Sequence, residues 1–125
     1  MKSQEHLEQC TVVAWARLQE RKYPDLWFLY AIPNGGLRHP AVAKKLKEEG
    51  VKAGGSDLHL PISRHGYHSL YIEMKSAGGR ISKAQTDWIN KAREQGNAAF
   101  VCYSANEAIE KLKWYLGGHR GSCDR

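Results

Sequence analysis

The chain has 125 residues and a mass of 14.1 kDa, which suits one domain with its own core and is too little for two ordinary domains. With 19 Lys and Arg against 13 Asp and Glu, the formal net charge is +6, and this excess of positive charge favours a polyanionic partner. No apolar run of about 18 residues could cross a bilayer and the N-terminus lacks the apolar stretch of a signal peptide, so no membrane partner is expected.

Hydrophobic spacing predicts the elements of the first third of the chain. A helix is expected over residues 3–21, whose apolar side chains recur on one helical face at Leu7, Cys10, Val13, Ala14 and Leu18. Residues 26–32 form an aromatic and aliphatic run typical of a buried strand, and residues 33–36 are expected to be a loop. Pro40 can begin a helix, so a second helix is expected from there to Glu49.

Two strands are expected in the middle of the chain. Residues 57–62 alternate as a strand does, with Pro61 limiting its length or marking an edge. The glycine-containing segment 51–56 before it is expected to be flexible. The polar segment 63–68 suits a hairpin connection, so residues 69–75 are expected to form the next strand, antiparallel to the first.

The last third is expected to contain two helices around one strand. Ser82 can cap a helix that runs to about Gln95, and residues 98–103 form the following strand. Ser104 can cap a final helix, and residues 117–125 are expected to be a disordered tail.

This order predicts an α/β fold in a single domain over residues 1–116, with a mixed four-stranded central sheet flanked by helices. The strands over 69–75 and 98–103 should be parallel because a helix connects them. The three cysteines form no Cys-x-x-Cys pair, which argues against a thiolate zinc site, and Cys10 and Cys102 are expected in the core.

Three polar side chains are expected to meet where the two middle strands lie together. Asp57 opens the first of these strands, while Glu73 and Lys75 lie two residues apart on one face of the second. Carboxylate oxygens suit a hard divalent cation, which polarises a phosphoryl group and lowers the pKa of a bound water. A nearby amine can orient that water or offset charge in the transition state. The set therefore predicts a metal-dependent phosphodiesterase.

A Glu-x-Lys triplet taken alone is more often a solvated strand face than an active site. The surrounding charge is more informative, because cations suited to phosphates flank the acidic residues on both sides. They are Lys44, Lys45, Lys47 and Lys52 before Asp57, and Arg80 and Lys83 after Lys75.

The order of loop, aspartate, hairpin, Glu-x-Lys, loop and helix resembles the PD-(D/E)XK nuclease superfamily and, more narrowly, its VRR-NUC family of virus-type replication and repair nucleases. The matching stretches are Glu8–Gln9, Ile32–Gly36 with Arg38, Lys52–Leu58, Tyr71–Lys75, Gly78–Arg80 and Gln85. One departure is Ser56, where family members often have proline. The resemblance implies a restriction-endonuclease-like fold.

The resemblance also implies roles for single residues. The implied catalytic residues are Asp57, Glu73, Lys75 and Gln85. Asp57 and Glu73 would hold Mg²⁺, or Mn²⁺ in its place, together with the backbone carbonyl of Met74. Glu8 is the favoured first-helix acid, acting on the metal directly or through water, and Glu5 competes with it. DNA contacts are expected from Asn34, Arg38, Lys52, Arg80 and Lys83, and no organic cofactor is implied.

Other side chains admit a structural role. His65 and His68 have a spacing that could bind metal but suit a solvated hairpin better, and His59 shares a strand face with Asp57. Trp88 and Trp114 fall on inward helix faces and are expected in the core rather than as base-stacking platforms.

The function that the resemblance implies is a metal-dependent, structure-selective endodeoxyribonuclease. It would resolve four-way (Holliday) junctions as a homodimer in the cytoplasm of a bacterial cell or a virus-infected host cell. A nicking or flap-cleaving repair nuclease is the alternative among enzymes. A catalytically inactive DNA-binding module is the alternative of another class, and the carboxylates argue against it because a pure binder gains little from acids facing phosphates.

Overall fold

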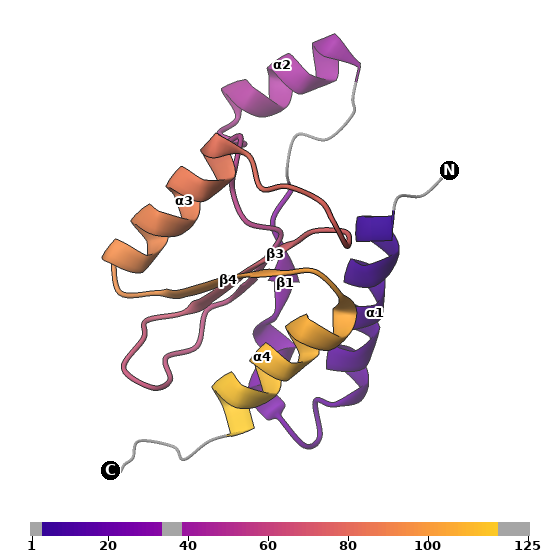
Figure 1. Cartoon of the computed structure of the whole chain (residues 1–125), viewed down its shortest axis with the longest axis vertical. Helices are drawn as coiled ribbons and strands as arrows, with labels where there is room; N and C mark the ends of the chain where they lie inside the picture. The colour runs from indigo at the N-terminus through magenta and orange to yellow at the C-terminus, as the bar shows by residue number, and fades with distance from the viewer. Residues whose placement is uncertain (1–3, 34–38, 118–125) are drawn as a thin grey trace.

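The computed structural model describes residues 4–33 and 39–117, so the predicted contacts Asn34 and Arg38 and the expected tail beyond residue 117 lie outside the described residues. Helices lie on both sides of one sheet (Figure 1). The elements are α1 (Gln4–Leu18), the 3₁₀ helix η1 (Pro24–Phe28), β1 (Tyr30–Ala31), α2 (Pro40–Glu48), β2 (Leu58–Leu60), β3 (Leu70–Met74), α3 (Lys83–Glu94), β4 (Ala98–Cys102) and α4 (Ala105–Gly117).

The sheet contains four strands in the order β1-β2-β3-β4. β2 is antiparallel to both β1 and β3, whereas β3 and β4 are parallel. The short connection between β2 and β3 permits only an antiparallel pair, and the helix between β3 and β4 provides the crossover that a parallel pair needs. The predicted α/β class and mixed sheet are therefore confirmed.

Alternation along the strands divides the side chains between two layers. Ile72 and Met74 belong to the larger apolar cluster, formed with α1 and α4. Tyr71 and Ala99 point to the opposite face, where they pack with Ile89 of α3 in a smaller cluster. α1 and α4 thus cover one face of the sheet and α3 covers part of the other (Figure 1).

The segment expected as a buried strand over 26–32 is divided between two elements: residues 26–28 belong to the 3₁₀ helix η1, and residues 30–31 form the short, exposed strand β1. Pro24 occupies its first turn because its fixed φ suits a helical start. Leu26 and Leu29 are buried three residues apart, whereas Trp27 between them is 67% exposed. The prediction was wrong because a continuous apolar run does not distinguish a strand from a helical turn.

α1 buries a different face from the one expected. Its buried residues are Val12 and Ala16, while Leu7 and Leu18 are exposed and Cys10 is exposed. Apolar residues lie on several sides of this helix, so their period did not identify the face that packs on the sheet. The expectation for Cys10 was wrong, and the expectation that Cys102 is in the core is confirmed.

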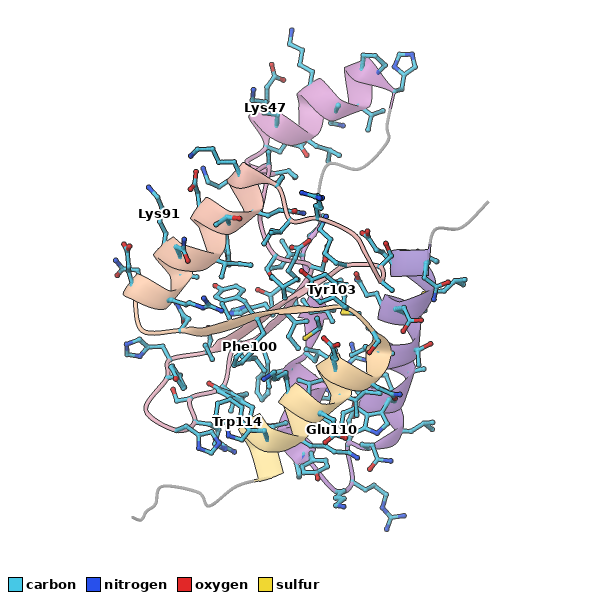
Figure 2. The ribbon with its side chains drawn as sticks, viewed as in Figure 1. Lys47, Lys91, Phe100, Tyr103, Glu110 and Trp114 are labelled. Atoms are coloured by element: carbon cyan, nitrogen blue, oxygen red, sulfur yellow. The ribbon has the colours of Figure 1, made fainter. Side chains whose placement is uncertain are left out.

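α4 packs through Tyr115 and turns Trp114 outward. Trp114, labelled in Figure 2, is 44% exposed, so the expectation that it lies in the core was wrong. Its ring stacks on His65 at a centroid distance of 4.6 Å. Tyr115 is fully buried, and its hydroxyl donates a hydrogen bond of 2.6 Å to the carbonyl of Ile62. This bond ties α4 to the segment that leaves β2.

α2 stands apart from the sheet (Figure 1), and none of its residues is buried. Pro40 is its first residue, as predicted, and the side chain of His39 caps it by accepting from the N–H of Ala41. In the ranges that the structure describes, no helix combines the length and apolar character needed to span a membrane.

We expect Tyr115→Phe to lower the free energy of unfolding by about 1 kcal/mol, because the carbonyl of Ile62 loses its donor while the ring still fills the core. Urea unfolding followed by circular dichroism measures this change. Tyr103→Phe is the matched control, since Tyr103 is exposed on the strand exit and should tolerate the same deletion. Equal stability of the Tyr115 variant and wild type would contradict the expectation.

Candidate active site

Asp57 is fixed between two strands at the start of β2. Its N–H donates to the carbonyl of Ile72 at 3.1 Å, and its carbonyl accepts from the N–H of Ile32 at 2.8 Å. Its side-chain Oδ2 accepts from the N–H of Met74 at 2.7 Å. The carboxylate therefore lies against the backbone of β3, beside Glu73.

Part of the segment that leads into Asp57, which was expected to be flexible, packs closely against α3. Gly54 has φ +84°, and a Cβ at this position would lie 2.7 Å from the carbonyl carbon of Ala84. Only glycine permits this approach of the segment to the first turn of α3. Ser56 is buried next to Asp57. The loop and α3 thus hold each other in place.

Glu73 is the buried acid of the site, with a residue exposure of 3%. Its Oε2 accepts a hydrogen bond of 2.9 Å from Nε2 of Gln85. Its Oε1 is buried and has no hydrogen-bond donor among the residues that the structure describes. A buried carboxylate oxygen without a donor is costly unless a proton or a cation satisfies it.

Burial, followed by the charge of Asp57 and a hydrogen bond to it, raises the pKa of Glu73 from 4.5 to about 8. The positive charge of Lys75 opposes this shift and the negative charge of Glu5 adds to it. Two carboxyl groups this close cannot both ionise easily, so Glu73 keeps its proton to a higher pH than an isolated glutamate does. A divalent cation would replace that proton.

Gln85 serves both α3 and the acidic pair. It is the third residue of α3, where its Oε1 accepts from the N–H of Ser82 at 2.8 Å and its N–H donates to Oγ of Ser82 at 3.1 Å. This capping box fixes the side chain so that its amide nitrogen reaches Glu73. A glutamate could complete the same cap, but it would offer no donor to Glu73 and would add a negative charge.

The structure brings Asp57, Glu73, Lys75 and Gln85 together, and the donors fit a hard divalent cation. The two carboxylates supply oxygens, and the unsatisfied Oε1 of Glu73 is the observation that supports a cation there. Within residues 4–33 and 39–117, no group of three or more Asp, Glu, His or Cys side chains is arranged to hold a metal. Backbone oxygen, for which the carbonyl of Met74 is the candidate, and water would have to complete the coordination.

The first-helix acids have different surroundings from those expected. Glu8 Oε1 accepts from the N–H of Ala105 at 2.6 Å, which caps the N-terminus of α4, and Oε2 accepts from Gln4. Glu5 is the first-helix acid whose charge acts on Glu73. Because Glu8 is engaged in this cap and the charge of Glu5 helps to raise the pKa of Glu73, we favour Glu5 as the first-helix acid of this site.

The described candidates for DNA contact lie around α3. Lys83, the first residue of α3, pairs with Asp87 at 2.8 Å, so part of its charge is already compensated. Lys52 and Arg80 are exposed. His65 stacks on Trp114 in the hairpin after β2, which supports a structural role over a metal site for this histidine.

A polar and aromatic row beside the acidic pair escaped the sequence analysis. Tyr30, His59 and Tyr71 face one another across β1, β2 and β3 in register. The hydroxyl of Tyr30 lies 2.7 Å from Nδ1 of His59, and the His59 ring stacks on Tyr71 at 4.1 Å. Nε2 of His59 lies 3.0 Å from Oγ of Ser69, and burial lowers the pKa of His59. Strand register is the signal that could have found this row, but sequence does not give register directly.

This chain is similar to known proteins in both sequence and fold. The sequence model of the VRR-NUC domain matches residues 1–106. A solved structure titled VRR_NUC domain protein is similar to this chain at a TM-score of 0.78 and 28% identity, covering 94% of this chain and 91% of that chain. No curated protein matches the sequence.

In the absence of metal, we expect the protein to become less stable as pH rises from 5.5 to 8. The pKa of Glu73 is about 8 when folded against an ordinary 4.5, so the folded protein keeps a proton that the unfolded chain has released. The resulting loss is up to roughly 3 kcal/mol across this window. Urea unfolding in EDTA at several pH values measures it.

Glu73→Gln should flatten this pH dependence, because the amide does not titrate. Glu110→Gln is the control, since the Glu110 side chain is 72% exposed on α4. If wild type and Glu73→Gln lose stability in parallel, the acidic pair does not hold the proton.

A second experiment should distinguish the roles of Glu5 and Glu8. Glu8→Ala removes the acceptor for the N–H of Ala105 and should cost about 1 kcal/mol of stability. Glu5→Ala should leave stability within ~0.5 kcal/mol and weaken Mn²⁺ binding in isothermal titration calorimetry. The reverse pattern, in which Glu8→Ala weakens Mn²⁺ binding at unchanged stability, would return the metal-proximal role to Glu8.

Proposed function

The chain belongs to the VRR-NUC domain family, and from this membership we propose that it is a divalent-metal-dependent endodeoxyribonuclease acting on branched DNA. The family itself implies a nuclease-type function with DNA as substrate. The observation that carries the finer proposal is the buried Glu73 carboxyl, which has an unsatisfied oxygen beside Asp57 and is influenced by the charge of Lys75.

The side chains divide the work of phosphodiester hydrolysis. Asp57 and Glu73 would hold Mg²⁺ or Mn²⁺, which when bound polarises the phosphoryl group and lowers the pKa of a water. Gln85 holds the Glu73 carboxylate in one orientation through its amide. The Lys75 ammonium can orient the attacking water and offset the negative charge that develops on the phosphoryl oxygens. The N–H of Met74 fixes the carboxylate of Asp57.

We further propose that the substrate is a four-way junction cut by a homodimer. Two copies related by a two-fold axis would present two sites for paired cuts across a junction of matching symmetry. This proposal rests on the resemblance to junction-resolving nucleases. Light scattering at working concentration tests the dimer, and a mass of one chain would contradict it.

Cleavage assays test the enzyme. Labelled four-way junctions, flaps and duplexes are incubated with Mg²⁺, Mn²⁺ or EDTA, and we expect symmetric paired nicks on the junction with either metal and none in EDTA. Lys75→Ala should lower the rate ~100-fold or more, because a group that stabilises transition-state charge is lost. Lys113→Ala is the matched control, since Lys113 is a partly exposed lysine on α4, on the other side of the sheet.

Each outcome of these assays has a definite meaning. Cleavage confined to flaps, or scattered nicks in duplex, would replace junction resolution by a general repair nuclease. Binding without cleavage under either metal would contradict the enzyme and favour a DNA-binding module. Cleavage that survives in Lys75→Ala at the wild-type rate would remove the proposed role of that lysine.

A further inference from the structure

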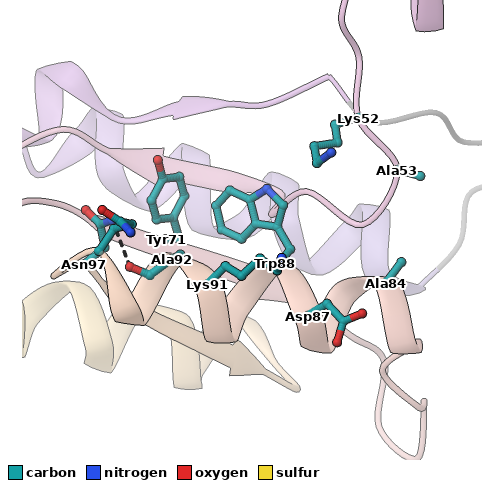
Figure 3. Close-up of a pocket in the computed structure, with 10 residues that line it drawn as sticks. Lys52, Ala53, Tyr71, Ala84, Asp87, Trp88, Lys91, Ala92 and Asn97 are labelled. Carbon is teal, nitrogen blue, oxygen red and sulfur yellow. Dashed lines mark hydrogen bonds between the residues drawn. The ribbon is translucent and has the colours of Figure 1, made fainter.

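An open cavity of about 560 Å³ lies between α3 and the segment that precedes Asp57. Charged and aromatic side chains line part of it, namely Lys52, Tyr71, Asp87, Trp88 and Lys91. Figure 3 shows Tyr71 of β3 beside Trp88 of α3, with Lys52 reaching toward them from the neighbouring segment. The volume is in the range of sites that bind small molecules or single nucleotides.

Two aromatic rings form the wall of this cavity. Tyr71 and Trp88 meet edge to face, with their centroids 4.5 Å apart and their planes at 79°. Both residues pack against the small apolar cluster beneath α3 but are only partly buried, so part of each side chain is accessible. Tyr71 is held from its other side by the stacked ring of His59. Exposed aromatic faces can bind unstacked bases.

Positive charge flanks the rings. Lys52 and Lys91 line the cavity and are exposed, one on the segment before β2 and the other on α3. Asp87 also borders the cavity, but its carboxylate is paired with Lys83 at 2.8 Å. Two lysines beside a pair of aromatic rings are complementary to a phosphate backbone whose bases are turned inward.

The cavity adjoins the acidic pair. Tyr71 precedes Glu73 by two residues on the same face of β3, which corresponds to a separation of roughly 7 Å along the strand. Ala84 borders the cavity, and the next residue along α3, Gln85, donates to Glu73. A DNA strand with its phosphate at the carboxylates would therefore place an adjacent nucleotide at this opening.

We infer that this cavity is a subsite for an unpaired nucleotide of the substrate DNA, next to the phosphate that is cut. Trp88 stacks on the base with Tyr71 at the edge of the stack, while Lys52 and Lys91 contact the flanking phosphates. The inference rests on the proposed function for the identity of the ligand as DNA. In a four-way junction a base at the crossover would have to leave its pair to enter this subsite, because a paired base within a duplex cannot enter.

Oligonucleotide binding in EDTA tests the subsite without requiring cleavage. The probe is a short fluorescein-labelled oligothymidylate, followed by fluorescence anisotropy, with a labelled duplex for comparison. Trp88→Leu should weaken oligothymidylate binding about tenfold, and Trp88→Phe should recover most of the loss. Trp114→Leu is the matched control, because Trp114 is a tryptophan on α4, which packs on the opposite side of the sheet. Duplex binding should change less than ~2-fold in all three variants.

A charge variant keeps the test independent of the folding of Trp88→Leu. Lys91→Glu changes an exposed helix residue and should weaken oligothymidylate binding and lower its salt dependence by about one counterion, whereas Lys113→Glu should change neither. The inference is overturned if Trp88→Leu and Lys91→Glu bind like wild type, or if both lose duplex and oligothymidylate binding equally. It is also overturned if Trp88→Leu changes the oligomeric state measured by light scattering, because the cavity would then be an interface between copies of the chain.

Failure of this inference and failure of the proposed function are distinguishable. If the protein cuts junctions but Trp88→Leu and Lys91→Glu bind oligothymidylate normally, only the subsite is contradicted. If the protein never cuts DNA but these variants lose oligothymidylate binding, the subsite is supported and the nuclease proposal is contradicted.

Discussion

The structure depends on one costly interaction, the burial of the Glu73 carboxyl against Asp57. A buried acid whose second oxygen lacks a donor destabilises the fold unless a proton or a cation occupies the gap. The amide of Gln85 and the charge of Lys75 reduce this cost without removing it, as the raised pKa of Glu73 shows. Proteins tend to keep such unfavourable groups where they serve chemistry, and here the family membership gives that chemistry as nuclease-type.

Three segments remote in sequence cooperate to hold this pair. The segment before β2 presents Asp57, β3 presents Glu73 and Lys75, and the first turn of α3 presents Gln85. The segment before β2 approaches the backbone of Ala84 so closely that only Gly54 fits, and the capping box of α3 fixes the amide that reaches Glu73. A cap that usually serves helix stability alone thus also orients the acid.

The two faces of the sheet have different tasks. The face covered by α1 and α4 contains the larger apolar cluster and supplies most of the core. The other face is covered only in part by α3, and it presents the acidic pair, the Tyr30, His59 and Tyr71 row and the open cavity beside Trp88. Stability is concentrated on the first face, so the second can accommodate polar and partly exposed side chains.

The sequence by itself determined the α/β class and the order of the main strands and helices, because strand alternation and helix caps are local patterns. It also identified Asp57, Glu73, Lys75 and Gln85 as candidate site residues, because the spacing of their motifs is local as well. Only the tertiary structure decided which face of α1 is buried, that residues 24–28 form a 3₁₀ helix, and that Trp114 turns outward. It also decided that Glu8 caps α4 while the charge of Glu5 acts on Glu73. These outcomes depend on which surfaces meet across the fold, and contacts between residues far apart in the chain leave no local pattern from which they could be predicted.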